Sequence, residues 1–231
     1  MSNFTDRHVV VTGGTGALGS AVVGALLGAG ATCTVSYIVE AETQRFAHRS
    51  AAKVKLIQVP DLADEASVAE VYQDVRPWAS IHIAGSFAIG KVIDTDKAAL
   101  TAQLNNNLIS CFLCCRAAVN AMRGSGGRIV NVAARPALEW RSGAGMTAYA
   151  VAKTGVAALT VALAEEVAKD NILVNAVAPS IMDTAANRTA MPKADFAGWP
   201  KVEQVAATII FLASPENTVT RGAIVPVYGK A

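Results

Sequence analysis

Short apolar runs rich in β-branched residues alternate along this chain with longer segments in which apolar residues recur at helical spacing. The short runs predict strands at His8–Thr12, Thr32–Tyr37, Val54–Val59, Ser80–Ala84, Arg128–Ala133, Ile172–Ala178 and Ala223–Val227. The longer segments predict helices at Ala17–Ala29, Glu40–Ala52, Ala63–Val75, Thr95–Met122, Met146–Lys169 and Lys201–Leu212. Because helices rather than hairpin turns separate the strands, we expect parallel pairing through right-handed crossovers. The pattern predicts an α/β fold with a doubly wound, seven-stranded parallel sheet and helices on both faces.

The predicted elements use nearly all of the 231 residues, of which 52% are hydrophobic and only 16% are charged. Such a chain fits one domain, which we place at residues 1–231. The formal net charge of +2 is too small to indicate a nucleic-acid or anionic-membrane partner. No run approaches the roughly 18 uninterrupted apolar residues of a membrane span, and the first residues, MSNFTDRH, lack the apolar run of a signal peptide. We expect a soluble, cytoplasmic protein that acts on a small-molecule substrate, without a nucleic-acid or membrane partner.

The cysteines and histidines do not form a recognisable metal motif in the sequence. Cys111 and Cys114 make a CxxC pair, but they lie within a predicted helix, with no second pair and no neighbouring histidine. We predict that this pair, with Cys115, forms a buried helix face and binds no metal. Structural or surface roles are predicted for the scattered histidines, His8, His48 and His82.

Three glycines, Gly13, Gly16 and Gly19, stand between the first predicted strand and the first predicted helix, in the run VTGGTGALGS. Glycine allows a tight turn and a close approach of the backbone to a pyrophosphate, and a helix N-terminus offers N–H groups and a positive dipole end to the phosphates. Because the loop opens a chain with a parallel-sheet pattern, it predicts a dinucleotide-binding domain, a Rossmann-type three-layer sandwich.

Tyr149 and Lys153 stand four residues apart in a predicted helix, so their side chains project from one face, a single turn apart. A tyrosine hydroxyl has a pKa near ~10 when unperturbed, and a nearby ammonium lowers this pKa by favouring the phenolate. Taken alone, the pair is also typical of an ordinary helix surface. Together with the glycine loop, it predicts proton exchange with a substrate.

The glycine loop and the YAVAK run resemble those of the short-chain dehydrogenases/reductases, and further motifs of that family follow in order over the full chain. The resemblance implies that Tyr149 is the general acid, that Lys153 lowers its pKa and binds the nicotinamide ribose, and that Asn107 supports a water relay to the lysine. It also implies cofactor contacts from Gly13, Thr15, Gly16, Leu18, Gly19, Tyr37, Asp61, Leu62, Ala84, Gly85, Tyr149, Lys153, Pro179 and Thr184.

The chain departs from the family pattern at several positions. Ala134, at the end of the fifth predicted strand, replaces the serine that polarises the substrate carbonyl, and Ser142 on the following loop is a candidate replacement. His82 and Ile83 replace two asparagines, and Ser180 replaces a glycine. Either catalysis is impaired or the substrate does not need that hydroxyl donor.

The segment IMDTAANRTAMPKADFAGW resembles one branch of the family, the dihydropteridine reductases, which use the Tyr/Lys pair without the serine. The physical reason is that a quinonoid dihydropterin accepts hydride into a conjugated C=N system, so no alkoxide forms. The alternative is a substrate lid, residues 179–200, whose local packing persists while the ligand differs. Loop position places four residues on the substrate side, namely Arg135, Trp140, Asn187 and Arg188. The resemblance is carried by Asp183, Thr184, Asn187, Arg188, Met191, Pro192, Ala194, Asp195, Phe196 and Trp199.

Tyr37 ends the second predicted strand, where NAD-dependent members of the family commonly have an aspartate that repels a 2′-phosphate. The missing carboxylate favours NADP over NAD. Arg45 or Arg49 would have to reach back from the next helix to bind the phosphate.

Three functions fit these features. The first is NAD(P)H-dependent reduction of a small conjugated substrate such as quinonoid dihydropteridine. The second is a carbonyl or 3-oxoacyl thioester reductase in which Ser142 or a water replaces the serine. The third is a nucleotide-sensing binding protein that is catalytically weak.

Two predicted helices, Thr95–Met122 and Met146–Lys169, carry apolar residues on more than one face. Their apolar surface is larger than one face of the sheet can cover. The family resemblance implies that these helices pair between subunits. We therefore expect a homodimer or homotetramer.

Overall fold

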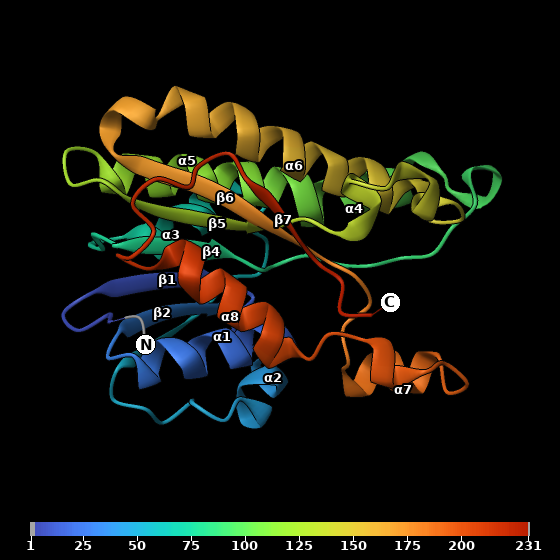
Figure 1. The fold of residues 1–231 in the computed structure, drawn as a ribbon, viewed down its shortest axis with the longest axis horizontal. Helices are drawn as coiled ribbons and strands as arrows, with labels where there is room; N and C mark the ends of the chain where they lie inside the picture. Colours follow the sequence, from blue (N-terminus) through green and yellow to red (C-terminus); the bar gives the residue numbers. More distant parts are fainter. Residues whose placement is uncertain (1–2, 231) are drawn as a thin grey trace.

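The computed structural model describes residues 3–230 and confirms the predicted fold class. Seven parallel strands form one sheet in the order β3-β2-β1-β4-β5-β6-β7 (Figure 1). The strands are β1 (His8–Thr12), β2 (Thr32–Tyr37), β3 (Val54–Gln58), β4 (Ala79–His82), β5 (Gly127–Val132), β6 (Ile172–Pro179) and β7 (Ile224–Val227). The order reverses between β1 and β4, which is where ligands bind in doubly wound sheets. Residues 1, 2 and 231 of the predicted domain lie outside the described residues.

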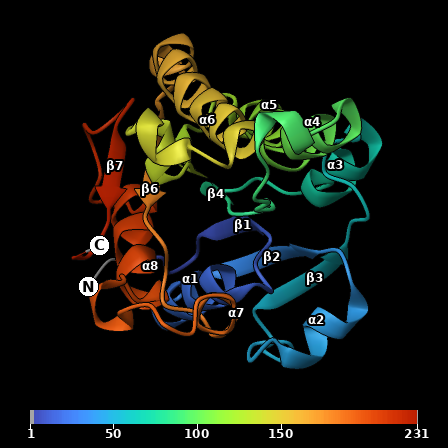
Figure 2. The same cartoon turned by 90° about the vertical axis from the view of Figure 1, so that its right-hand side faces the viewer.

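Helices cover both faces of the sheet and form the predicted three layers (Figure 2). They are α1 (Ala17–Gly28), α2 (Glu40–Arg45), α3 (Glu65–Tyr72), α4 (Lys97–Leu104), α5 (Ser110–Met122), α6 (Thr147–Glu166), α7 (Ala185–Ala190) and α8 (Val202–Ala213). Along β1, Val9 and Val11 point into the core beneath α1 and α8, whereas Val10 points into the core beneath α3, α5 and α6. Both faces of the central strands are therefore apolar, as a buried parallel sheet requires.

The prediction of one continuous helix at Thr95–Met122 is wrong, because a π-helical turn at Asn105–Ile109 separates α4 from α5. In this turn the side chain of Asn107 donates to the carbonyl oxygens of Ser86 and Gln103. The spacing of apolar residues does not predict this turn, because the residues on both sides of it keep a helical period. Such turns are frequent at functional sites.

Two other predicted boundaries change for reasons of packing. The helix predicted at Glu40–Ala52 ends at Arg45, because Phe46 takes an extended backbone and buries its ring in the core. The segment after β6, predicted to be irregular, contains α7 and a 3₁₀ turn at Phe196–Gly198.

Helix α6 is the one described helix that is long and apolar enough, by length and composition, to cross a membrane. Its Ala152, Val156 and Ala164 are buried against the sheet. This packing is typical of a core helix in a globular domain.

Candidate active site

The glycine loop lies at the carboxyl end of β1, next to β4, where the strand order reverses. Gly13 has a φ of 66°, and a Cβ at this position would lie 2.8 Å from the nitrogen and Cα of Ala84. A Cβ on Gly19 would collide with the carbonyl oxygen of Gly13. The loop is thus packed backbone against backbone, which only glycine permits.

Helix α1 begins at Ala17, after the N-cap residue Gly16, and no side chain among residues 3–230 caps its first turn. A Cβ on Gly16 would meet only the Gly13 carbonyl oxygen, at 3.5 Å, so the approach to the helix end is open. The uncapped N–H groups and the positive dipole end fit a pyrophosphate. Leu18, predicted to contact the cofactor, buries its side chain in the core, so this contact would have to come from its backbone.

Tyr149 and Lys153 project from one face of α6, as predicted, and the π turn brings Asn107 to them. The Lys153 side chain is buried, and its Nζ donates to the carbonyl oxygen of Val132, the last residue of β5, over 2.8 Å. The same Nζ lies 5.9 Å from the centre of the Tyr149 ring. Phe87, on the loop after β4, packs edge-on against Tyr149 with 5.0 Å between ring centres. A strand end and a loop therefore orient the catalytic pair.

Asn107 and Lys153 converge on the backbone of Gly85. The Nδ2 of Asn107 donates to the carbonyl oxygens of Ser86 and Gln103 at 2.9 and 3.0 Å. Its buried Oδ1 has no hydrogen-bond partner in the described part of the chain. A Cβ on Gly85 would lie 2.6 Å from this Oδ1 and 3.3 Å from Lys153 Nζ. A free acceptor and an ammonium thus flank one point next to the glycine loop, which fits the polar ribose of a nicotinamide nucleotide.

Burial controls the proton affinities of the catalytic pair. Loss of solvation raises the pKa of Tyr149 to about 12 and lowers the pKa of Lys153 to about 8. The predicted lowering of the Tyr149 pKa by Lys153 does not appear in this arrangement, because the hydroxyl is desolvated and the ammonium donates its hydrogen bond to Val132. Tyr149 therefore keeps its proton at neutral pH and is suited to act as an acid.

The substrate side of the pair has no serine hydroxyl at the end of β5. Ala134 occupies this position and is buried. Ser142, the candidate replacement, is exposed, and its hydroxyl donates to the carbonyl oxygen of Glu139 within its own turn, over 2.8 Å. Its hydroxyl is therefore engaged by local backbone.

The structure shows the contacts of Arg135 and Trp140, two residues predicted to lie on the substrate side. The guanidinium of Arg135 pairs with Glu139 at 2.7 Å and lies 5.0 Å from the ring centre of Tyr228. Trp140 is 75% exposed and lines a hollow of about 460 Å³ with Thr147, Ala150, Val151 and Thr154. Neither Tyr149 nor Lys153 lines this hollow, and the position of Trp140 on the substrate side stays a prediction.

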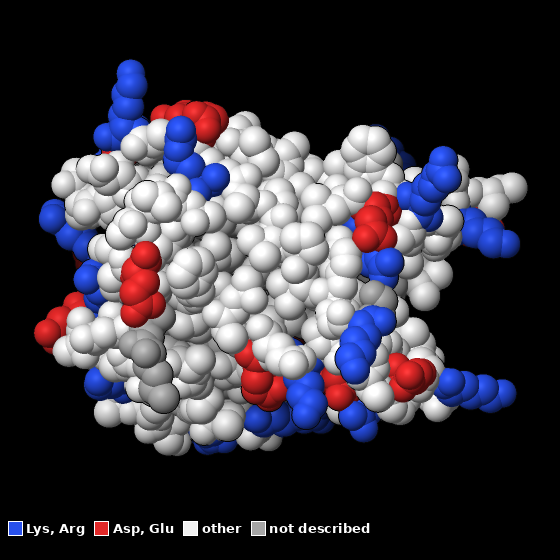
Figure 3. Space-filling view, in the orientation of Figure 1, with Lys and Arg blue, Asp and Glu red and all other residues white. Residues whose placement is uncertain are grey.

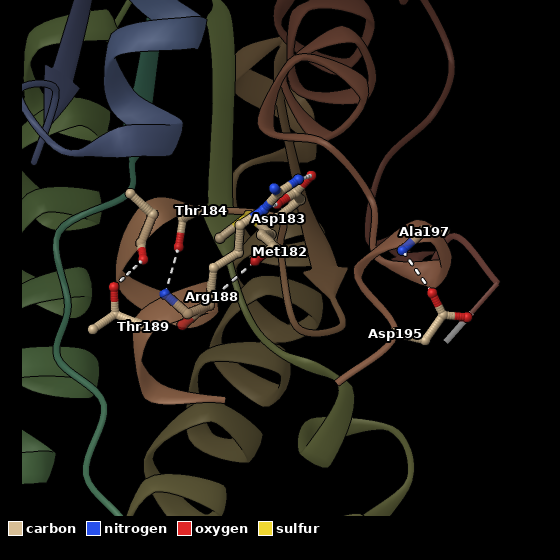
Figure 4. Close-up of polar contacts among 9 residues, drawn as sticks. Met182, Asp183, Thr184, Arg188, Thr189, Asp195 and Ala197 are labelled. Atoms are coloured by element: carbon tan, nitrogen blue, oxygen red, sulfur yellow. Dashed lines mark hydrogen bonds and ion pairs between the residues drawn. The ribbon is translucent and has the colours of Figure 1, made fainter. Parts of the chain in front are cut away.

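The lid motif, at residues 183–199, forms contacts within itself (Figure 4). Arg188 makes a bidentate ion pair with Asp183, at 2.6 and 2.8 Å, and its guanidinium lies 4.9 Å from the ring centre of Phe196. Phe196 in turn packs on Trp199, with 5.0 Å between ring centres. In this structure Arg188 thus supports the lid motif, and its predicted substrate role stays a prediction.

Two other predicted residues of the lid also support its backbone. The hydroxyl of Thr184 accepts from the N–H of Asn187 and caps α7. The Asn187 amide donates to the carbonyl oxygen of Met182 over 2.8 Å. Asn187, like Arg188, therefore supports the lid in this structure, and its predicted contact with the substrate stays a prediction.

The remaining predicted cofactor residues lie at strand ends. Pro179 is the last residue of β6, and Ala84 and Gly85 follow β4. Asp61 follows β3 and accepts from the N–H of Ala63 over 2.7 Å, while Leu62 buries its side chain in the core because it faces the sheet.

The sequence reasoning missed two carboxylates near the glycine loop. Tyr37 donates to Glu40 at 2.8 Å, and the hydroxyl of Thr15 donates to Glu42 at 2.8 Å. Both glutamates lie in the first turn of α2, directly after β2. Because these glutamates follow Tyr37 so closely in the sequence, their position could have indicated carboxylates near the cofactor. Phe87, Gln103 and Ser86 were missed as well, because only the fold brings their loops to the catalytic pair.

A dinucleotide-dependent oxidoreductase requires a phosphate site at a helix start and, within reach of it, a group that can transfer a proton as hydride moves. The switch point of this sheet supplies both. A profile of the short chain dehydrogenase family matches residues 7–195. The chain belongs to the short-chain dehydrogenase/reductase family and is an NAD(P)-dependent oxidoreductase.

Several characterised relatives span nearly the whole chain. The 2,3-dihydroxy-2,3-dihydro-p-cumate dehydrogenase of Pseudomonas putida is 30% identical over 241 residues, which cover 95% of this chain and 92% of the relative. The trans-4-hydroxycyclohexanecarboxylate dehydrogenase of Sinomonas cyclohexanicum is 29% identical, with coverages of 99% and 95%. Among solved structures, a blue fluorescent protein from a metagenomic library in complex with NADPH has a TM-score of 0.88 at 26% identity, with coverages of 99% and 97%.

Proposed function

We propose that this enzyme reduces a small conjugated heterocycle, of which quinonoid dihydropteridine is the representative. The observation that carries the proposal is the methyl group of Ala134 where the family has a serine hydroxyl, with Ser142 engaged by its own turn. A ketone that accepts hydride becomes an alkoxide and needs a donor for the developing charge. A quinonoid ring spreads the added electron pair over its conjugated system and needs one proton.

The residues of the site divide this work. A nicotinamide dinucleotide supplies hydride when bound. The glycine loop and the start of α1 would hold its pyrophosphate, and Asn107 and Lys153 its ribose. Tyr149 donates the proton to the substrate. Phe87, which is 57% exposed beside Tyr149, offers an apolar aromatic surface for a flat ring.

Turnover of chemically generated quinonoid dihydropterin is expected to exceed turnover of simple ketones and 3-oxoacyl thioesters in steady-state assays. We expect Ala134→Ser to raise ketone turnover relative to pterin turnover, because it restores an oxyanion donor. Ser142→Ala is the matched control and is expected to change neither rate. Faster wild-type reduction of ketones than of the pterin would contradict the proposal.

A second candidate function is oxidoreduction of a hydroxyl or ketone group on a ring. The relatives named above support it, since their names describe dehydrogenases of hydroxylated rings. In that case a water would have to replace the missing serine. A loss of ketone activity in the Ser142→Ala enzyme would instead assign the role to Ser142.

We propose NADH as the preferred cofactor, which revises the preference for NADP drawn from Tyr37 alone. The carboxylates of Glu40 and Glu42 lie 2.8 Å from Tyr37 and Thr15, two residues expected to contact the cofactor. Two negative charges there oppose the 2′-phosphate of NADPH and can accept from ribose hydroxyls. In the described chain, Arg45 and Arg49 form no ion pair and lie on the exposed side of the segment after Glu42.

Replacing Glu40 and Glu42 together by glutamine is expected to raise the kcat/KM ratio of NADPH to NADH by about tenfold or more, equivalent to about 1.4 kcal/mol. The reason is that the change removes both carboxylates near the expected 2′-phosphate. Glu70→Gln, an exposed residue of α3, is the control and should leave the ratio unchanged. A wild-type enzyme that prefers NADPH would show that the carboxylates do not select the cofactor.

We further propose that the protein self-associates through exposed apolar side chains on its long helices. Phe112 on α5 and Val151 and Val161 on α6 are between 46% and 52% exposed. A second uncharged area lies over α8 and β7, in the middle of the face in Figure 3, with charged side chains around its edge. Light scattering at micromolar concentration tests this proposal, and a monomeric mass would contradict it.

A further inference from the structure

A buried cluster that the proposed reaction does not use lies between the sheet and α5. It comprises His82 at the end of β4 and Cys111 and Cys115 on α5, and the candidate ligand atoms of the three residues lie within 4.8 Å of one another. All three side chains are 6% exposed or less. The sequence pairs Cys111 with Cys114 and shows no nearby histidine, whereas the fold pairs Cys111 with Cys115 and brings His82 to both.

The distances from Cys115 fit a tetrahedral metal ion. Cys115 Sγ lies 3.5 Å from His82 Nδ1 and 3.4 Å from Asn131 Oδ1. Ligand bonds of about 2.3 Å to sulfur and about 2.0–2.1 Å to nitrogen place the two ligand atoms about 3.6 Å apart in a tetrahedral site. The Cys115 and His82 atoms are therefore already at the separation that a shared metal ion requires. His82 Nδ1 and Asn131 Oδ1 are 2.8 Å apart, a hydrogen-bond distance, so metal binding would break this hydrogen bond and move the two atoms apart by about 0.6 Å.

We propose that Cys111, Cys115 and His82 bind a zinc ion, with Asn131 Oδ1 as the fourth ligand. A donor set of two thiolates and an imidazole selects zinc over hard cations such as Mg²⁺ and Ca²⁺. The +2 charge of the ion balances the two thiolates, so the buried site is neutral. Binding releases the two thiol protons to solvent.

The surroundings of His82 suit a metal ligand. When Nδ1 binds the ion, the proton of the neutral ring resides on Nε2 and needs an acceptor. His82 Nε2 lies 2.9 Å from Ser80 Oγ and 3.2 Å from Tyr72 OH, and either hydroxyl oxygen can accept it. The orientation of the Asn131 amide is fixed by a hydrogen bond from its Nδ2 to Thr160 Oγ1, at 2.9 Å.

The ion would connect β4 and β5 to the start of α5. Cys111 follows Asn107 by four residues, directly after the π turn. The ion would therefore have a structural role, because it would fix the segment that carries Asn107.

Cobalt and zinc binding to the whole protein, stripped of metal by a chelator, tests this inference without an activity assay. Wild-type protein titrated with Co²⁺ is expected to develop thiolate-to-cobalt charge-transfer bands with a stoichiometry of one ion per chain, which Zn²⁺ abolishes. Zinc at a hundredfold excess over its Kd should raise the melting temperature by about 5–10 °C. Absence of the bands from wild-type protein would overturn the proposal.

Two variants locate the site. Cys115→Ala should lose the charge-transfer bands and the melting-temperature shift. Cys33→Ala is the matched control, because Cys33 is an equally buried thiol in the core on the other face of the sheet, and it should keep both. Unchanged bands in Cys115→Ala protein would contradict the assignment. If that variant does not fold, the wild-type titration alone decides, since it must also release two protons per ion.

Discussion

Replacing Tyr149 by phenylalanine is expected to lower kcat for reduction by about 10²–10⁴-fold, because the variant has no hydroxyl to protonate the substrate. The pKa of Tyr149, raised by burial to about 12, keeps this hydroxyl protonated in the wild-type enzyme at neutral pH. Phenylalanine retains the ring that packs edge-on against Phe87, so the variant should fold. Steady-state turnover of quinonoid dihydropterin measures the effect.

The Tyr149→Phe result needs a measurement of cofactor binding beside it. Binding of NADH, followed by fluorescence, should change little, since the glycine loop is intact. Tyr228→Phe is the matched control, as it removes a tyrosine hydroxyl outside the catalytic pair, and it should keep wild-type turnover. Turnover of Tyr149→Phe equal to wild type would remove Tyr149 from the role of general acid.

Replacing Lys153 by methionine is expected to stabilise the protein while lowering kcat by about 10²-fold or more. Burial lowers the pKa of Lys153 from 10.5 to about 8, which corresponds to about 3 kcal/mol of destabilisation while the lysine is charged. Methionine has similar length without the charge, although it loses the hydrogen bond to Val132. We therefore expect the free energy of unfolding at pH 7 to rise by about 1–3 kcal/mol.

The stability difference between Lys153→Met and wild type should depend on pH in a defined direction. The unfolded lysine keeps its proton up to about pH 10.5, whereas the folded lysine loses it at about pH 8. Between these values the unfolded state binds more protons, so this lysine makes wild-type stability rise with pH. The advantage of the variant is thus full below pH 8 and disappears as the pH approaches 10.5. The raised pKa of Tyr149 acts in the opposite direction above pH 10, but it is common to both proteins.

Urea unfolding at several pH values between 7 and 10 measures this difference. Lys169→Met, in the exposed 3₁₀ turn Ala168–Asp170 that follows α6, is the control and should show neither the gain in stability nor the loss of activity. A variant less stable than wild type at every pH would show that the hydrogen bond to Val132 outweighs the cost of burying the charge.

The predictability of the fold differed between strands and helices. The bounds of β1 and β2 agree with the sequence prediction at both ends, because both strands are short runs rich in β-branched residues, most of which are buried. The π turn at Asn105–Ile109 was not predicted, because it depends on contacts of Asn107 with a distant loop. Phe46 ended α2 early for a similar reason, since its ring is drawn into the core.

In the candidate site, too, the features set by local spacing were predictable, and those set by contacts between distant residues were not. Gly13, Tyr149 and Lys153 were predictable, because local spacing determines both the turn after β1 and the shared face of α6. The roles of Trp140 and Arg188 were not predictable. Trp140 lines a hollow to which neither Tyr149 nor Lys153 contributes, and Arg188 pairs with Asp183.

By itself the sequence determined the parallel sheet, the glycine turn and the Tyr149/Lys153 pair, because each follows from spacing over a few residues. Only the tertiary structure decided the raised pKa of Tyr149, the carboxylates beside Thr15 and Tyr37, and the meeting of His82 with two thiols of α5. Burial and contacts between residues far apart in the chain create these properties. They depend on how the layers pack, which no local pattern encodes.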